Sequence, residues 1–247
     1  MRRQPLARIQ PTSVRRQLRE WRSAIRRDRA YYEKSERSTF LRRALWALAF
    51  NGISGDYAEF GCWSGVTFGL AHQQIRLSGR PRHLWAFDSF RGLPSSTQHD
   101  DDHPVWQQGE YAMSVEEFRS SCDENGIPVS DYDVIEGFYS ETLADPGSAG
   151  LPSDIALAFV DCDLYSSTSD VLAFLATRLK HGMIVAFDDY FCYSENTLAG
   201  ERKALLELAG QQNSAFHFSP YIQFGWHGMS FIVEDRVLLG ELEAGVP

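Results

Sequence analysis

Short runs of apolar residues, separated by turn signals, recur along the chain from residue 57 onward. They predict β-strands at 57–60, 83–87, 132–136, 155–160 and 183–187, and a terminal strand pair at 216–218 and 229–233. The run 155–160 is apolar at every position, as expected for a strand buried on both faces of a sheet. This pattern predicts a sheet with a fully covered centre.

Segments with helical spacing of apolar residues lie before and between these runs. They predict helices at 14–31, 38–51, 66–77, 114–125, 168–179 and 200–208. Ser114 and Glu117 have the spacing of a capping box, which supports a helix start at that point. Strand, glycine turn, helix and strand follow one another as in a βαβ unit, so we predict an α/β fold whose sheet is mostly parallel.

Charge divides the chain into two parts. Residues 1–43 hold fourteen Arg or Lys and four Asp or Glu, a net charge of +10, so the remaining residues carry −19 of the total of −9. We therefore predict a basic helical N-terminal arm at 1–43 and one domain at 44–247. The arm is expected to dock on the acidic body or on a second copy, forming a homo-oligomer, or to favour an anionic acceptor. Nucleic acid is not expected as a partner, because the acidic body would repel it.

The composition also indicates in which cellular compartment the protein is expected. No apolar run reaches the ~18 residues that a membrane-spanning helix needs, and no secretory signal opens the sequence. The four cysteines are scattered without paired spacing, so neither a disulfide framework nor a zinc ribbon is indicated. We expect a cytoplasmic protein without a membrane span.

Acidic residues stand at the carboxyl ends of four predicted strands. They are Glu59, Asp88, the pair Asp161 and Asp163, and the pair Asp188 and Asp189. In open parallel sheets, ligands bind beyond the carboxyl ends of the strands, near the point where strand order reverses. The sequence therefore predicts one shared site at this edge of the sheet.

The turn after the first strand suggests what one half of this site binds. Residues 59–65 contain Gly61 and Gly65 but lack the third glycine of a dinucleotide fingerprint. A carboxylate at Glu59 would repel a pyrophosphate, whereas it suits the cationic amino group of S-adenosylmethionine. Asp88 lies where an acid accepts hydrogen bonds from ribose hydroxyls. S-adenosylmethionine is therefore the expected cofactor.

The aspartates at the later strand ends suggest a metal. Carboxylates on neighbouring strand ends repel one another unless a cation lies between them. Hard oxygen ligands favour Mg²⁺ or Ca²⁺. The alternative is that Asp163 or Asp189 caps the helix that follows, which leaves Asp161 and Asp188 unexplained.

In combination these motifs resemble one known family, the macrocin O-methyltransferase-like group of S-adenosylmethionine enzymes that methylate macrolide and aminocoumarin sugars. The resembling segments are 59–65, 88–94, 109–111, 136–143, 161–168 and 188–190, and the likeness covers roughly residues 40–235. It implies a Rossmann-like class I methyltransferase fold with a seven-stranded, mostly parallel sheet, helices on both faces and an antiparallel C-terminal strand. It also implies Mg²⁺-dependent methylation of a sugar hydroxyl in secondary metabolism.

The resemblance assigns roles to residues of this chain. Cofactor contacts are implied for Glu59, Gly61, Ser64, Gly65, Asp88, Ser89, Gly137 and Phe138, and metal ligation for Asp161, Asp188 and Asp189. A carboxylate beside the metal takes the proton of the acceptor hydroxyl, with Asp161 the first candidate and Asp163 the second. Which of these two is the direct metal ligand is left open.

Three alternatives remain at this point. Asp161 and Asp163 would also suit a metal-dependent glycosyltransferase that binds a nucleotide diphosphate. Adjacent hydroxyls of a catechol bind a metal as those of a sugar do, so a phenol O-methyltransferase fits as well. A non-catalytic relative that uses the arm to hold a partner is disfavoured by the complete acid set. The segment 226–228 is expected either to line the acceptor pocket or to pack as a simple turn.

Overall fold

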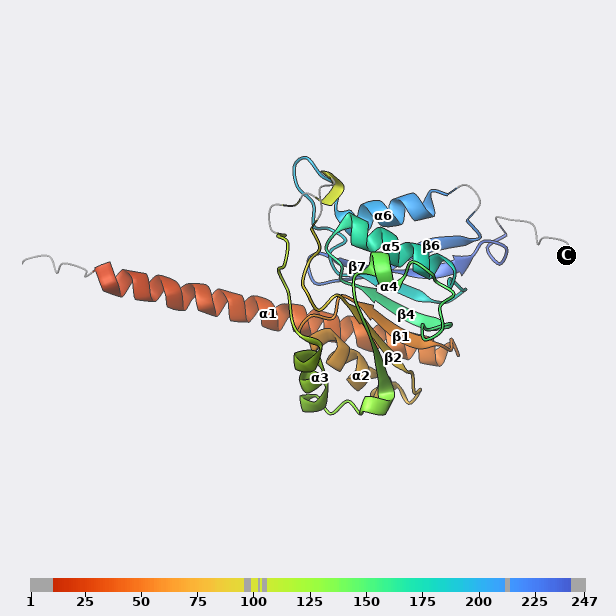
Figure 1. Ribbon diagram of the computed structural model, residues 1–247, viewed down its shortest axis with the longest axis horizontal. Helices are drawn as coiled ribbons and strands as arrows, with labels where there is room; N and C mark the ends of the chain where they lie inside the picture. The colour runs from red at the N-terminus through yellow and green to blue at the C-terminus, as the bar shows by residue number, and fades with distance from the viewer. Residues whose placement is uncertain (1–10, 96–98, 102, 104–105, 212–213, 241–247) are drawn as a thin grey trace, which may run out of the picture.

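The computed structural model describes residues 11–95, 99–101, 103, 106–211 and 214–240, which form one sheet between two sets of helices (Figure 1). The strands are β1 (Asp56–Phe60), β2 (Leu84–Asp88), β3 (Tyr132–Glu136), β4 (Ile155–Val160), β5 (Ile184–Phe187), β6 (Phe216–Phe224) and β7 (Gly228–Asp235). Their order is β3-β2-β1-β4-β5-β7-β6, with β7 antiparallel to both neighbours. The predicted seven-stranded, mostly parallel sheet with antiparallel pairing at its C-terminal end is confirmed.

Helices cover both faces of this sheet. They are α1 (Pro11–Phe50), α2 (Val66–Ser78), α3 (Val115–Glu124), α4 (Tyr139–Thr142), α5 (Tyr165–Ala176) and α6 (Gly200–Ala209). Side chains of α1, α2 and α3 pack with one face of the strands, and side chains of α5 and α6 pack with the other. The capping box of Ser114 and Glu117 is present at the start of α3, as predicted.

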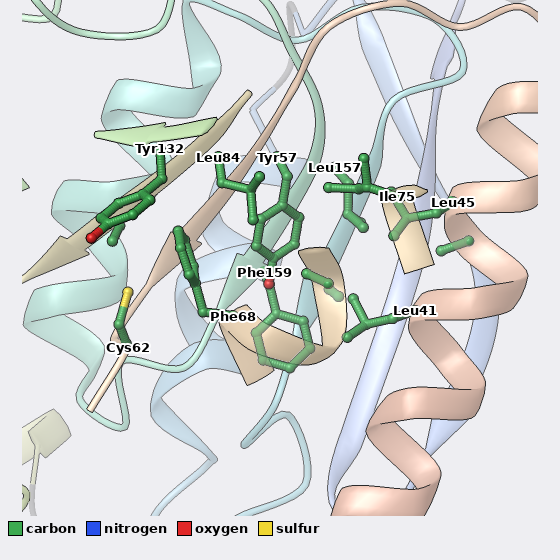
Figure 2. Close-up of a cluster of buried hydrophobic side chains, with 14 of the residues drawn as sticks. Leu41, Leu45, Tyr57, Cys62, Phe68, Ile75, Leu84, Tyr132, Leu157 and Phe159 are labelled. Carbon is green, nitrogen blue, oxygen red and sulfur yellow. The ribbon is translucent and has the colours of Figure 1, made fainter. Parts of the chain in front are cut away.

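Strand β4 lies at the centre of the sheet, and all six of its residues are buried. Leu157 and Phe159 point to the face covered by α1 and α2, whereas Ala158 and Val160 point to the face covered by α5. Figure 2 shows the first of these cores, where Leu41 and Leu45 of α1 lie beside Leu157 and Phe159. The continuous apolar run in the sequence thus reflects burial on both faces.

The N-terminal segment forms one helix where the sequence predicted two, at 14–31 and 38–51. α1 runs without interruption through 40 residues. Residues 32–37 contain neither proline nor glycine, and Arg29 and Glu33 form an ion pair one turn apart across the expected break. The expectation of a break was wrong because polar composition alone does not end a helix.

The N-terminal half of α1 projects away from the sheet, and its C-terminal half packs on it (Figure 1). The predicted boundary after residue 43 falls inside this helix: Phe40 and Leu41 are buried in the same core as Ala44 and Leu45. The division of the chain into an arm and a domain stays a prediction, and residues 1–10 and 241–247 lie outside the described residues. Among the described helices none is long and apolar enough to cross a membrane.

The register of the parallel strands brings their carboxyl ends to one edge. Phe60 at the end of β1 is paired with Phe87 of β2 and with Val160 of β4. Val160 is in turn paired with Phe187 of β5. The residues that follow these positions therefore meet at the same edge, and β1 and β4 form the point where strand order reverses.

Candidate active site

The turn after β1 requires glycine at its first position. Gly61 has a φ of 90°, and a Cβ atom there would lie 1.8 Å from the carbonyl oxygen of Asp161. Its backbone N–H donates to the carbonyl of Phe87 at 2.9 Å, which extends the β1–β2 pairing by one residue. Glycine at this position therefore lets the turn begin in direct contact with β2 and β4. The backbone of Gly61 lines a cavity.

Asp88 at the end of β2 holds this turn in place. Its Oδ2 accepts hydrogen bonds from the backbone N–H groups of Cys62 at 2.8 Å and Trp63 at 3.0 Å. Its Oδ1 accepts from the N–H of Phe90 at 2.7 Å. The acid predicted to face a ribose organises two loops, and it lies on the wall of the cavity.

Glu59 lies beneath the turn and does not line the cavity. It is 1% exposed, and its carboxyl forms a short hydrogen bond with the hydroxyl of Tyr57. Burial raises the pKa of Glu59 to about 8, and the hydrogen bond from Tyr57 and the charge of Arg37 oppose that rise. Ser64 and Gly65 are also absent from the residues lining the cavity, whereas Ser89, Gly137 and Phe138 are among them.

The second half of the site gathers the aspartates at the ends of β4 and β5. Asp161, Asp188 and Asp189 each offer a carboxylate oxygen, and these oxygens lie within 4.8 Å of one another. Asp163 also lines the cavity and has a φ of 60°, a left-handed conformation that is uncommon for a residue with a side chain. The predicted metal-ligand set is thus brought together, with Asp163 close by.

An arginine that no sequence motif singles out lies among these carboxylates. The Nε of Arg37 on α1 donates to Asp188 Oδ1 at 2.9 Å, and its Nη2 forms a second, shorter bond with Asp188 Oδ2. Nη2 also lies 3.6 Å from Asp161 Oδ2. One guanidinium therefore supplies positive charge to two of the three carboxylates.

Burial and nearby acidic groups raise the pKa values of two of these aspartates. Burial, and after it repulsion from Asp188, raise the pKa of Asp161 well above its usual range, against the opposing charge of Arg37. Burial, and after it the charge of Asp189, do the same to the pKa of Asp163. Carboxyls with raised pKa values at a cavity wall are suited to accept a proton near neutral pH.

A buried glutamate supports both aspartate-bearing strand ends from behind. Glu201 of α6 is fully buried; its Oε1 accepts from the backbone N–H of Cys162 at 3.1 Å and its Oε2 from that of Asp189 at 2.8 Å. Each carboxylate oxygen thus fixes the backbone beside one predicted ligand. The sequence offered no signal for this residue, since it lies in an ordinary helical stretch.

Replacing Glu201 with glutamine is expected to lower the free energy of unfolding by about 1–3 kcal/mol, because the amide NH₂ would face one of the two backbone N–H groups. Urea denaturation measures this loss. Glu124→Gln, an exposed glutamate at the end of α3, is the matched control and is expected to change stability by less than about 0.5 kcal/mol. Equal stability of Glu201→Gln and the wild type would contradict the role assigned to the carboxylate.

The cavity at this edge of the sheet has a volume of about 1250 Å³. The glycine turn and Asp88 lie on its wall together with the aspartate cluster, and α1 contributes Arg29, Glu33 and Arg37. Trp226 and His227, from the loop between β6 and β7, complete this part of the lining. Of the two expectations for segment 226–228, the structure places these two side chains at the pocket. The contribution of α1 was missed, because its residues are more than a hundred positions from the aspartates.

The chain matches one family model, that of macrocin-O-methyltransferase (TylF), over residues 28–203. It is 31% identical over 148 residues to the 8-demethyl-8-(2,3-dimethoxy-alpha-L-rhamnosyl)-tetracenomycin-C 4'-O-methyltransferase of Streptomyces olivaceus, covering 57% of this chain and 54% of that protein. It is 30% identical over 153 residues to the mycinamicin III 3''-O-methyltransferase of Micromonospora griseorubida, covering 57% of each. The chain thus spans little more than half the length of these two relatives.

A third relative and two solved structures complete the comparison. The demethyldecarbamoylnovobiocin O-methyltransferase of Streptomyces niveus is 27% identical over 179 residues, covering 69% of this chain and 66% of that protein. The O-methyltransferase NovP superposes with a TM-score of 0.67 at 24% identity, covering 80% of this chain and 79% of that one. The calicheamicin methyltransferase CalS11 superposes with a TM-score of 0.60 at 23% identity, covering 78% of each chain. At this identity the two structures show a shared fold.

Proposed function

Since this chain belongs to the macrocin-O-methyltransferase family, we propose that it transfers a methyl group from S-adenosylmethionine to a hydroxyl of a sugar on a natural product or glycan, with Mg²⁺ as a second cofactor. The observation that carries the proposal is the cavity wall itself, where the Gly61 turn and the cluster of Asp161, Asp188 and Asp189 share one space. A methyl donor on the turn and an acceptor on the aspartates would then lie side by side.

The glycine turn is the proposed place of S-adenosylmethionine, which supplies an electrophilic methyl group when bound. Gly61, Asp88, Ser89, Gly137 and Phe138 line that end of the cavity. Gly61 itself lines the cavity, and the space that a side chain would take there is filled by the backbone carbonyl of Asp161. Glu59, held under the turn by Tyr57, would carry the charge opposite the cationic methionine end.

The aspartate cluster is the proposed place of Mg²⁺, which would lower the pKa of an acceptor hydroxyl when bound. Three carboxylates offer only hard oxygen atoms, the ligand type that Mg²⁺ prefers, and their oxygens converge within 4.8 Å. Burial, followed by repulsion from neighbouring aspartates, raises the pKa values of Asp161 and Asp188, and the charge of Arg37 opposes that rise. Asp161, Asp188 and Asp189 therefore fit the ion, provided that Arg37 yields its hold on Asp188.

A carboxyl group on the same cavity wall is proposed to remove the proton of the acceptor hydroxyl. Asp161 is the proposed base, because its side chain is 25% exposed while Asp188 is 2% exposed and held on both oxygens by Arg37. Asp163 is the second candidate, since it lines the cavity and its pKa is raised as well. Either residue would take the hydroxyl proton as the oxygen attacks the methyl group.

The proposed acceptor bears a sugar. The curated relatives are named as O-methyltransferases of a rhamnosyl tetracenomycin, of mycinamicin III and of demethyldecarbamoylnovobiocin. Aromatic rings line the cavity: Trp63 and Tyr111 are in edge contact with ring centroids 5.4 Å apart, and Trp226 of the β6–β7 loop also lies on the wall. Such rings offer flat apolar surfaces beside the hydrogen-bonding groups of the site, as a glycoside requires.

A homo-oligomer formed through α1 is also part of the proposal. Trp21 and Tyr31 are exposed on the half of α1 that projects from the sheet, where they could contact a second copy.

Methyl transfer is tested by mass spectrometry of acceptors incubated with the full chain and S-adenosylmethionine. The panel contains a glycosylated macrolide, an aminocoumarin glycoside and a catechol, each with Mg²⁺ or with a chelator. The expected result is the gain of one methyl group on a glycoside in Mg²⁺ and none in chelator. Equal turnover in chelator would reject the metal, and methylation of the catechol alone would reject the sugar. Calorimetric binding of nucleotide sugars without binding of S-adenosylhomocysteine would point instead to glycosyl transfer.

The affinity for S-adenosylhomocysteine is expected to rise with pH up to about pH 8, by at most about tenfold per pH unit. Burial raises the pKa of Glu59 to about 8, so the free protein holds the carboxyl protonated at neutral pH, and the ammonium group of the bound ligand would favour loss of that proton. By the same shift, the stability contributed by this group is present below its unfolded pKa and is lost as pH rises through about 8. Calorimetry in buffers of different ionisation enthalpy counts the released proton at constant Mg²⁺.

Glu59→Gln is the control for this pH dependence, because it keeps the shape of the side chain and cannot ionise. Its affinity for S-adenosylhomocysteine is expected to be lower than that of the wild type at pH 8 and flat between pH 6 and 8. Identical pH profiles for the variant and the wild type would contradict the charge-pairing role of Glu59.

A further inference from the structure

A second set of potential metal ligands overlaps the aspartate cluster. Asp189, Cys192 and His227 each offer one atom, an oxygen, a sulfur and a nitrogen, that lie within 4.8 Å of one another. All three residues line the cavity, so the set is reached from solvent. This mixture of donors differs from the all-oxygen set of Asp161, Asp188 and Asp189.

Backbone hydrogen bonds hold the three residues in place. The N–H of Cys192 donates to the carbonyl of Asp189 at 3.0 Å, which closes a turn and puts both side chains on one side of it. The N–H of Phe191 in the same turn donates to the carbonyl of His227 at 2.9 Å. The turn after β5 is thereby fastened to the loop between β6 and β7, which keeps the backbones of the three residues together.

The distances between ligand atoms suit a small tetrahedral ion. Cys192 Sγ lies 3.0 Å and His227 Nδ1 lies 3.6 Å from Asp189 Oδ1. Metal–ligand bonds of about 2.0–2.3 Å at tetrahedral angles place neighbouring ligand atoms roughly 3.4 Å apart. The set therefore needs only small movements to surround a Zn²⁺-sized ion, with the fourth position open to the cavity.

A carboxylate lies at ion-pair distance from the other ring nitrogen of His227. His227 Nε2 lies 4.0 Å from Glu33 Oε1 on α1. Glu33 is itself held by Arg29 at 2.7 Å and by the indole N–H of Trp226 at 3.4 Å. A carboxylate behind a ligating histidine fixes the proton on the far nitrogen and frees the near one for the metal. In that tautomer Nδ1 gives up its short contact with the carbonyl oxygen of Asp188.

Arg37 contacts two members of the all-oxygen set, and His227 Nδ1 also lies 3.8 Å from Asp188 Oδ2. The guanidinium takes both oxygens of Asp188 and lies 3.6 Å from Asp161. Asp189 faces Cys192 and His227. Asp189, the carboxylate that the two sets share, therefore points towards the sulfur of Cys192 and the imidazole of His227.

We propose that Asp189, Cys192 and His227 form a binding site for a borderline-soft divalent metal of the Zn²⁺ class. Binding releases the thiol proton of Cys192 to solvent and forms a metal–sulfur bond, with no change in oxidation state. Because Asp189 is shared, an ion at this site removes one ligand from the set proposed for Mg²⁺. Zn²⁺ then inhibits methyl transfer, a consequence that rests on the proposed function, whereas binding itself does not.

The site is tested by titrating the full chain with Co²⁺ alone, in the absence of cofactor and acceptor, and recording absorption spectra. The expected result is one equivalent of Co²⁺ with a sulfur-to-metal charge-transfer band. Cys192→Ala is expected to lose that band, and Cys122→Ala, at a buried cysteine of α3, is the matched control that keeps it. Glu33→Gln is expected to weaken Co²⁺ binding by about 10–100-fold while keeping the band, because its effect runs through His227.

Two results would overturn the proposal: no charge-transfer band in the wild type at saturating Co²⁺, or an undiminished band in Cys192→Ala. His227→Gln is the second variant, expected to weaken binding at least about tenfold with the band retained. Since the titration contains neither S-adenosylmethionine nor an acceptor, its outcome is independent of methyl transfer. In an activity assay, Zn²⁺ is expected to inhibit the wild type in competition with Mg²⁺ and to inhibit Cys192→Ala less.

Discussion

Asp161→Asn is expected to lower kcat for methyl transfer by about 10²–10⁴-fold, the usual contribution of a positioned general base. An amide neither accepts the hydroxyl proton near neutral pH nor offers a charged oxygen to the metal. Asp161 is the carboxylate best placed for the task, because its side chain is partly exposed at the cavity while Asp188 is covered by Arg37. In the metal-free protein, burial and the neighbouring aspartates raise its pKa.

Asp163→Asn is the matched comparison, since Asp163 lines the same cavity and its pKa is raised by the same causes. A loss below about tenfold in this variant would exclude Asp163 as the base. A larger loss in this variant than in Asp161→Asn would assign the base to Asp163 and leave Asp161 as a metal ligand. Binding of S-adenosylhomocysteine, measured by calorimetry, shows whether the cofactor end of the site is intact in both variants.

Arg37→Met is expected to lower the free energy of unfolding by about 3–5 kcal/mol in chelator, because the buried carboxylate of Asp188 is left without its partner. The variant also removes the positive charge nearest to Asp161, which adds repulsion within the cluster. Mg²⁺ is expected to restore more stability to this variant than to the wild type, since the ion no longer competes with the guanidinium for Asp188. Urea denaturation with and without Mg²⁺ measures both effects.

Arg42→Met is the control for this experiment, because Arg42 is an exposed arginine on the same helix. Its change in stability is expected to stay within about 0.5 kcal/mol, with no effect of Mg²⁺ beyond that of the wild type. Should Arg37→Met fail to fold, Arg37→Lys keeps the charge without the paired geometry and is expected to fall between the two. A wild-type-like Arg37→Met in chelator would show that the guanidinium does not balance the aspartates.

One face of α1 contributes three charged side chains to the cavity wall. Arg29, Glu33 and Arg37 lie on one face of α1, one turn apart, and all three line the cavity. Arg37 reaches the aspartates, and Glu33 and Arg29 reach the β6–β7 loop, where Arg29 lies 5.2 Å above the ring of Trp226. Metal binding and acceptor binding would therefore both involve this face of α1. The Arg37 variants test its contact with the aspartates, and the Glu33 variant tests its contact with the β6–β7 loop.

Local pattern determined the sheet and the backbone of the site. The apolar run 155–160 required burial on both faces, which only a central parallel strand offers, and it became β4. Parallel strands in register place their carboxyl ends at one edge, so Gly61, Asp88, Asp161 and Asp188 were predictable neighbours. The single helix α1 was not predictable in the same way, because a polar stretch between two apolar ones is compatible with either a break or a continuous helix.

Tertiary structure alone decided the charges and side chains around that backbone. Arg37 and Asp188 are 151 positions apart, and their pairing depends on how α1 packs across the sheet. Glu201 reaches Cys162 and Asp189 only because α6 lies behind both strand ends. His227 joins the site because antiparallel β7 returns its loop to the end of β5. Sequence spacing records which residues follow a strand, whereas contacts between distant elements are set by packing, and these contacts fix the charge balance of the site.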